Sequence, residues 1–138
     1  MSADWEDTDL VFRQVHPHHW DGKNPNSVAF SPTPKDGDKL SVDDSKKVTA
    51  EKSWHHFNLN LGFRSIGTWA VSVGEIKSAG DLFLQREPII NQDDISKNND
   101  AHCLIDFSHL TSKGQRKKRA QELAIRASER GCQFLASA

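Results

Sequence analysis

The sequence predicts an α+β domain: a small mixed or antiparallel sheet with a central strand over residues 66–76, flanked by two helices. The central strand is inferred from a run that is apolar or small on both faces, as in a strand covered on both sides. The helices are inferred from apolar residues at helical spacing, over residues 49–61 and again over residues 112–130. A chain of 138 residues is long enough for one domain with one modest core.

Both predicted helices have recognisable ends. Thr49 is placed to cap the first helix, and Gly62 follows its last residue, where glycine commonly ends a helix. Ser112 and Gln115 have the spacing of a capping box at the start of the second helix, and Gly131 marks its end. These residues indicate where each helix begins and ends, which the apolar pattern alone does not.

Short strands are predicted in the rest of the chain, joined by connections that contain the prolines. They cover residues 10–15, 28–31, 39–43 and 102–107, with residues 132–135 as an edge strand. Residues 91–100 are rich in Asn and Asp and are predicted to form an exposed loop. Asp106 lies on an otherwise apolar strand, so we expect a structural carboxylate with hydrogen-bond partners.

The composition favours a globular protein that works inside the cell. Apolar residues make up 36% and charged residues 27% of the chain, and no apolar run is long enough to cross a bilayer. The start of the chain does not resemble a signal peptide, and two cysteines are too few for a disulfide scaffold. We therefore predict one cytoplasmic domain over residues 1–138, with a loose acidic N-terminus at residues 1–8.

The start of the last helix is strongly basic, although the net charge of the whole chain is only −1. Lys113, Arg116, Lys117 and Arg119 are the candidate binding residues there, and Lys118 adds a fifth cation. Cations at a helix N-terminus oppose the helix dipole, and a bound anion would remove that cost. The pattern predicts contact with RNA or with another acidic partner, while a solvated basic face is the alternative.

The strongest candidate for catalysis is the pair formed by Arg13 and His16 at the end of the first strand. Arginine binds two phosphate oxygens at once, and histidine exchanges protons near neutral pH. His56, on the first helix, is a candidate second titrating group, and Glu75 is a carboxylate near the exit of the central strand. The histidine-rich stretch at residues 16–19 has no carboxylate or cysteine at a recognised ligand spacing, so no metal site is predicted.

Hydroxyls and a lysine close to one another in sequence form a second group of candidates. Ser31, Lys39 and Ser41 could hold a nucleotide or an RNA backbone, since such groups bind phosphate and sugar oxygens. The chain has no Gly-x-Gly-x-x-Gly or Walker pattern and no other sign of a cofactor. Ordinary turn chemistry explains the same residues without a ligand.

The leading hypothesis is a small enzyme that performs metal-free acid–base chemistry on RNA or a nucleotide, as a ribonuclease does. Arg13, Ser31 and Glu75 would equally suit an NAD-using ADP-ribosyl transfer site. A third hypothesis is a non-catalytic binding protein or inhibitor, whose interface would combine the basic helix with loops around Trp5 and Trp20.

Overall fold

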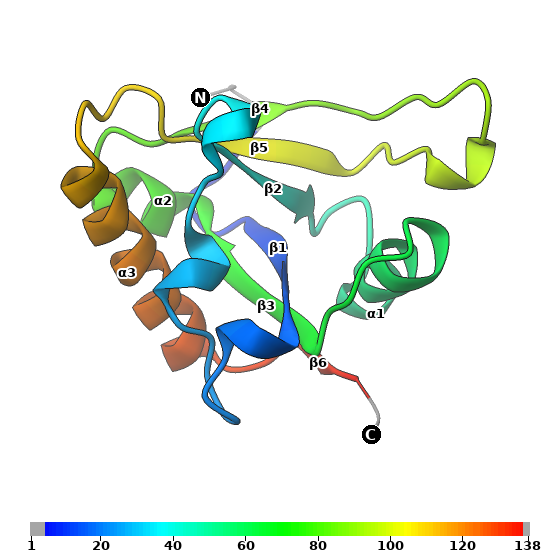
Figure 1. Cartoon of the computed structure of the whole chain (residues 1–138), viewed down its shortest axis with the longest axis horizontal. Coiled ribbons are helices and arrows are strands. Elements are labelled where there is room, and N and C mark those ends of the chain that lie inside the picture. Colours follow the sequence, from blue (N-terminus) through cyan, green and yellow to red (C-terminus); the bar gives the residue numbers. More distant parts are fainter. Residues whose placement is uncertain (1–4, 137–138) are drawn as a thin grey trace.

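The computed structural model describes residues 5–136 and confirms the α+β fold with an antiparallel sheet (Figure 1). Within these residues the sheet has six strands in the order β4-β5-β2-β1-β3-β6. The strands are β1 (Leu10–Val15), β2 (Lys39–Asp44), β3 (Gly67–Ser72), β4 (Phe83–Arg86), β5 (His102–Asp106) and β6 (Phe134–Leu135). The α-helices are α1 (Ala50–His55), α2 (Val73–Ala79) and α3 (Lys113–Arg130).

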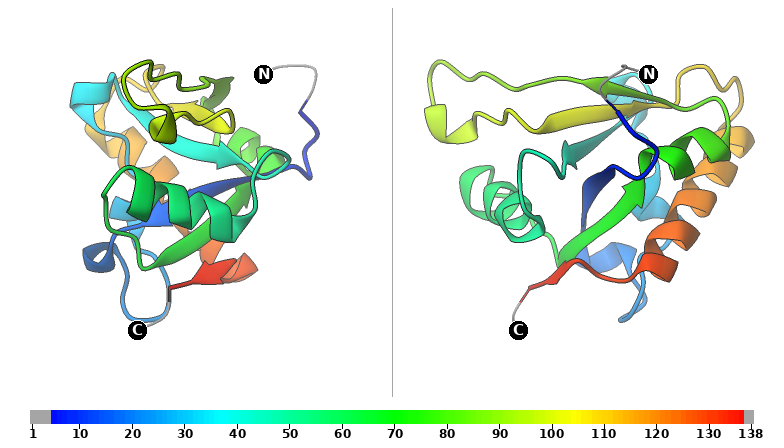
Figure 2. Two further views of the ribbon diagram at one scale, coloured as in Figure 1. Left: turned by 90° about the vertical axis from the view of Figure 1, so that its right-hand side faces the viewer. Right: turned by 180° about the vertical axis from the view of Figure 1, so that it is seen from behind.

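Helices cover opposite faces of the sheet, as the two rotated views show (Figure 2). On one face α1 packs over β1 and β3, where the Gln14 side chain donates a hydrogen bond to Ser53 on the helix. On the other face α3 buries Ala120, Leu123 and Ala127, which belong to the same core as Trp69 on β3. Small residues on α3 allow this close approach to the sheet.

The two middle strands of the sheet, β1 and β2, pair over only part of their length. β1 pairs with β3 along its whole length, from Leu10 opposite Ser72 to Val15 opposite Gly67. With β2 it pairs only at Val11 and Phe12, after which the two strands separate. The side chain of Arg13, the next residue along β1, spans this separation.

The predicted central strand over residues 66–76 is wrong in its length and in its position. β3 ends at Ser72, and β1 and β2 occupy the middle of the sheet instead. Ser72 and Glu75 form a capping box: the Ser72 hydroxyl accepts from the Glu75 N–H, and the Glu75 carboxylate accepts from the Ser72 N–H. This cap starts α2 inside the apolar run, because it satisfies two main-chain donors that a helix start leaves free.

Other boundaries also differ from the sequence-based prediction. The predicted strand at residues 28–31 is a 3₁₀ helix at Ser27–Phe30, capped by Asn26. The first helix is α-helical only to His55 and continues as a π-helical turn at His56–Asn60. Strand β4 was not predicted, whereas the capping box at Ser112 is confirmed.

The core holds apolar side chains of the strands, of α2 and of α3, and it also holds Trp5. Trp5 is 7% exposed, with the cations of Lys46 and Arg86 over its ring. Its burial removes Trp5 from the interface that the non-catalytic hypothesis assigned to it. Trp20 is half-buried against the same core, with its ring centroid 6.2 Å from that of Trp69. None of the helices in the described part of the chain is long and apolar enough to span a membrane.

Candidate functional site

A cleft of about 240 Å³ lies between the sheet and the segment that follows α1. Its floor comes from β1, β2 and β5: Phe12, Arg13, Gln14, Ser41, Val42, Asp43 and His102. Its walls come from the π-helical turn and the following loop, with His56, Phe57, Leu61 and Phe63, and from Ile89 and Asn99 beside β4 and β5. The walls are therefore mainly apolar and the floor carries most of the polar groups.

Arg13 spans the separation between β1 and β2 and is held by main-chain oxygens. Its Nε donates to the Ala29 carbonyl at 2.7 Å and its Nη1 to the Ser41 carbonyl at 3.0 Å. No carboxylate within residues 5–136 lies within ion-pair distance of the guanidinium. Burial lowers the pKa of Arg13 to about 10, which leaves it cationic at neutral pH. A desolvated cation without a counter-ion is an anion site.

Ser41 and His102 form a hydrogen-bonded pair on the floor of the cleft. Ser41 Oγ lies 3.1 Å from His102 Nε2, and His102 Nδ1 lies 2.8 Å from the Glu87 carbonyl oxygen. A carbonyl oxygen only accepts, so Nδ1 carries the hydrogen, and the Nε2 of the neutral ring accepts from the Ser41 hydroxyl. His102 is 8% exposed, whereas Ser41 is exposed.

His56 presents a second ring nitrogen with a different role. The Asn60 amide nitrogen, which also donates to the Ser96 carbonyl at 2.8 Å, lies 3.3 Å from His56 Nδ1. If Nδ1 accepts, the hydrogen of the neutral ring is on Nε2. The His56 Nε2 is buried and has no hydrogen-bond partner among the described residues. A π-helical turn is frequent at functional sites, and here it places His56 in the wall of the cleft.

The remaining polar side chains of the floor are engaged in hydrogen bonds with neighbouring side chains of the protein. Asp43 accepts from Asn99 at 2.8 Å and from Ser53 at 2.7 Å. Gln14 donates to Ser53 and to Thr68, both at 2.9 Å. This network fixes the floor against α1, and it leaves Arg13, Ser41, His56 and His102 as the groups that face a ligand.

His16 lines a neighbouring cleft of about 360 Å³ rather than the one just described. Arg13, His19 and Arg64 also line it, and Arg13 is thus one of the residues that the two clefts share. Arg13 and His16 thus line one cleft, with His19 as a second histidine in its lining. Burial lowers the pKa of both His16 and His19, and nearby cations lower it further.

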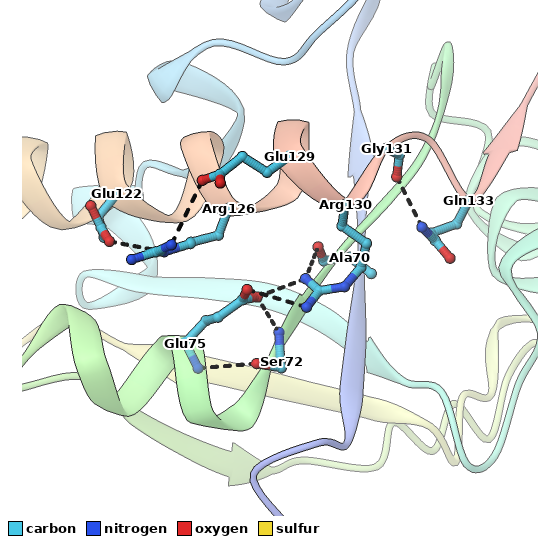
Figure 3. A network of polar contacts seen from close by, with 9 residues as sticks. All are labelled: Ala70, Ser72, Glu75, Glu122, Arg126, Glu129, Arg130, Gly131 and Gln133. Atoms are coloured by element: carbon cyan, nitrogen blue, oxygen red, sulfur yellow. Dashed lines mark hydrogen bonds and ion pairs between the residues drawn. The ribbon is translucent and has the colours of Figure 1, made fainter.

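Glu75 and Ser31 lie outside both clefts. Glu75 receives two hydrogen bonds from Arg130, at 2.6 and 3.2 Å, and Arg130 also donates to the Ala70 carbonyl (Figure 3). Burial raises the pKa of Glu75, but Arg130 and Ser72 outweigh it and hold that pKa below its usual value. Ser31 donates to the Ser27 carbonyl at 2.8 Å within a local turn. Both residues have structural roles here, and the structure does not bring them to Arg13.

The predicted binding cations are spread over other parts of the molecule. Lys39 lies opposite Asp106 on β5, and the Asp106 carboxylate accepts from the Ser108 N–H as a structural carboxylate should. Arg116 donates to the Leu110 carbonyl and Arg119 to the Gly80 carbonyl, so these two guanidiniums tie down the start of α3. Lys113 and Lys117 are exposed on that helix, on the face of the sheet opposite the cleft (Figure 1).

Comparisons with protein-family models, with curated proteins and with solved structures found no match to this chain. Within residues 5–136 no three His, Cys, Asp or Glu side chains are grouped so that they could hold a metal ion. The two cysteines are free thiols, Cys103 buried and Cys132 exposed. The site must therefore be interpreted from its own geometry.

Sequence reasoning found Arg13, Ser41 and His56 and missed His102. The signal for His102 was weak, because it was one histidine at the edge of an apolar strand. Its contact with Ser41 depends on how β2 and β5 align. Ser41 lies opposite Leu104 and Asp43 lies opposite His102, so Ser41 and His102 are diagonal neighbours on one face.

Proposed function

We propose that this protein is a small intracellular enzyme that performs metal-free acid–base chemistry on a phosphodiester of RNA or a nucleotide, within the cleft on the α1 face. The observation that carries the proposal is the guanidinium of Arg13. Arg13 is one of the residues that line the cleft, and its guanidinium has no carboxylate partner among the described residues and keeps its charge at neutral pH. A preorganised cation of this kind stabilises charge that develops on phosphate oxygens.

Two histidines divide the proton chemistry. His102 Nε2, oriented by the Glu87 carbonyl, has the lone pair that a general base requires. His56 Nε2 is a buried nitrogen without a partner, and a phosphate oxygen would satisfy it. His16 and its neighbours in the second cleft are placed to meet the next phosphate of a longer strand.

The apolar walls suit a nucleobase. Phe57 and Phe63 have ring centroids 5.2 Å apart, and Phe63 is 57% exposed at the rim of both clefts. Bases stack on aromatic rings with little dependence on sequence, which fits a single-stranded substrate. An inorganic phosphate would leave these walls without a contact.

The test is cleavage of an end-labelled ribo-oligonucleotide by purified protein in the presence of a chelator. We expect cleavage by the wild type, and losses of about 100-fold or more for Arg13→Lys and for His102→Gln. Lysine keeps the charge but loses the fork that binds two oxygens, and glutamine cannot act as a base.

Two control variants are matched to these changes. Arg126→Lys alters an arginine on the opposite face that pairs with Glu122, and Glu75→Gln alters a carboxylate outside the cleft. Both should cleave at the wild-type rate. No cleavage by folded wild-type protein, or equal loss in all four variants, would overturn the proposal.

The two other hypotheses have less support. An ADP-ribosyl transfer site would need Glu75 and Ser31 beside Arg13, and these residues make structural contacts elsewhere. A non-catalytic interface retains the exposed Lys113 and Lys117 but not the buried Trp5. An increase in melting temperature with NAD would revive the first, because a ligand stabilises the state that binds it.

A further inference from the structure

We propose that Ser41 is a covalent nucleophile, activated by His102, and that the reaction passes through a phosphoryl ester on its Oγ. The inference rests on the proposed function for its natural substrate, a phosphodiester. It goes beyond that function because it names the attacking atom, which would otherwise be a hydroxyl of the ribose or a water molecule.

The contacts of Ser41 are those of an activated hydroxyl. Its Oγ is 3.1 Å from His102 Nε2, and the imidazole is oriented in turn by the Glu87 carbonyl at 2.8 Å from Nδ1. Nucleophile, base and orienting acceptor are thus connected in series, the arrangement that activates a serine in covalent catalysis. Ser41 is exposed while His102 is buried, so an incoming electrophile reaches the hydroxyl and not the base.

Arg13 completes the arrangement from the other side of Ser41. Its Nη1 donates to the main-chain carbonyl of Ser41 itself at 3.0 Å, so the guanidinium is fixed beside the attacking residue. A phosphate held by Arg13 would therefore lie next to Ser41 Oγ. The negative charge that develops on its oxygens would meet a cation that needs no rearrangement.

The first step transfers the phosphoryl group to the protein. Ser41 Oγ attacks phosphorus while its proton passes to His102 Nε2, and the bond from Oγ to phosphorus forms. The bond from phosphorus to the leaving oxygen breaks on the side opposite Ser41, and that oxygen takes a proton from water, while His102 Nε2 keeps the proton of Ser41. The Glu87 carbonyl stabilises the transient imidazolium by accepting from Nδ1.

The second step returns the serine by hydrolysis. A water molecule attacks phosphorus from the side opposite Ser41 and releases a proton to the solvent, the bond from phosphorus to Oγ breaks, and Oγ takes its proton back from His102 Nε2. One water molecule is consumed and no metal or redox partner is needed. His102 takes the Ser41 proton in the first step and returns it in the second, which agrees with its contact to Ser41 Oγ.

The first test uses a small electrophile, so that it does not depend on RNA. Purified protein is incubated with diisopropyl fluorophosphate, and the adduct is located by intact mass and peptide mapping. We expect one adduct, on Ser41, that is absent in Ser41→Ala and forms about 100-fold more slowly in His102→Gln. Ser78→Ala is the matched control, because Ser78 is an exposed serine on α2 outside both clefts; its adduct should form at the wild-type rate.

Folding of each variant is checked by its thermal midpoint. If His102→Gln is unfolded, the comparison of Ser41→Ala with Ser78→Ala still decides whether Ser41 is the modified residue. Ser41 is exposed, so its truncation leaves the core intact. No adduct on the wild type, or an adduct on another residue, would overturn the assignment of Ser41.

The second test separates this inference from the proposed function. A ribodinucleotide and its 2′-deoxy analogue are offered to the same protein. If Ser41 attacks, both are cleaved and no 2′,3′-cyclic phosphate is formed. Cleavage of the ribose form alone, with a cyclic product and no adduct on Ser41, would overturn the nucleophile and keep the ribonuclease. An adduct on Ser41 with no cleavage of either dinucleotide would keep the nucleophile and overturn the phosphodiester substrate.

Discussion

At the scale of single residues, the contacts of Arg13 decide what the cleft can bind. A carboxylate partner would have neutralised the guanidinium and left a structural ion pair, as at Arg130 and Glu75. Main-chain carbonyls hold Arg13 without neutralising it. The same contacts give Arg13 a structural role, because two carbonyls that would otherwise lack a donor depend on it.

Arg13→Ala should therefore destabilise the protein as well as inactivate it. The carbonyls of Ala29 and Ser41 lose their donors, and we expect the free energy of unfolding to fall by about 2 kcal/mol. Urea unfolding followed by tryptophan fluorescence measures the change. Arg64→Ala, at the rim of the second cleft, should change it by less than about 0.5 kcal/mol. Equal stability of Arg13→Ala and wild type would show that the carbonyls do not need the guanidinium.

His16 and His19 predict a pH dependence of stability. Burial is the largest cause that lowers the pKa of each in the folded protein, below the ordinary value of 6.5. The unfolded chain then binds more protons than the folded one between the two pKa values, so their contribution to stability is present above about pH 6.5 and is lost as the pH falls through the folded pKa. The lowered pKa of Glu75 acts only near and below its ordinary value of 4.5.

We expect the urea concentration at the unfolding midpoint of the wild type to decrease as the pH is lowered from about 7.5 to about 5.5, the range where histidine titrates. The double variant His16→Gln/His19→Gln should lose most of this slope, while His55→Gln, an exposed histidine on α1, should keep it. An unchanged slope in the double variant would assign the pH dependence to other groups.

At the scale of elements, the sequence predicted those helix starts that depend on contacts between residues close together in the chain. The caps at Thr49 and Ser112 could be predicted from the sequence because each side chain accepts from a main-chain N–H only three residues away. The cap at Ser72 is of the same kind, but it lies inside an apolar run that was predicted to be one continuous strand, so the start of α2 was not predicted. The π-helical turn at His56–Asn60 has no comparable signal, because its register is set by contacts with the loop that follows.

Asn58 makes those contacts. Its amide donates to the Trp54 carbonyl at 2.8 Å, and its oxygen accepts from the Ser65 N–H at 2.9 Å. Asn58→Ala should lower the free energy of unfolding by about 1–2 kcal/mol and speed hydrogen exchange at the Ser65 amide. Leu59→Ala is the control in the same turn, since Leu59 is 69% exposed and should cost less than about 0.5 kcal/mol. Slow exchange at Ser65 in the Asn58 variant would mean that the turn is held elsewhere.

At the scale of the whole molecule, the candidate site depends on contacts that no short stretch of sequence contains. Ser41 and His102 are 61 residues apart, and they meet because β2 and β5 pair in one register. A shift of one residue would turn Ser41 to the other face of the sheet. Arg13 and Ser41 were predictable as residue types suited to phosphate, but their partners follow only from the folded structure: His102 from the order of the strands, and Ala29 from the place of its 3₁₀ helix beside β1.

The molecule also separates its exposed basic residues from its cleft. Lys113 and Lys117 lie on the α3 face and the cleft on the α1 face, so the variant Lys113→Gln/Lys117→Gln should cleave a dinucleotide at the wild-type rate. If these lysines contact longer RNA, the slope of log affinity against log salt for a 20-nucleotide strand should fall by about 1.4. Slower cleavage of the dinucleotide would place α3 within reach of the reacting phosphate.

The separation of β1 from β2 has a consequence for how such a protein can change. Arg13 joins the two strands and, in the proposed function, also binds the anion, so a change to one role would disturb the other. Leu61 and Phe63, in contrast, line the cleft from a loop outside the sheet, and Phe63 is largely exposed. If the proposed function holds, descendants of this chain could acquire new substrates by changing this wall, while the cation proposed to bind phosphate stays fixed in the sheet.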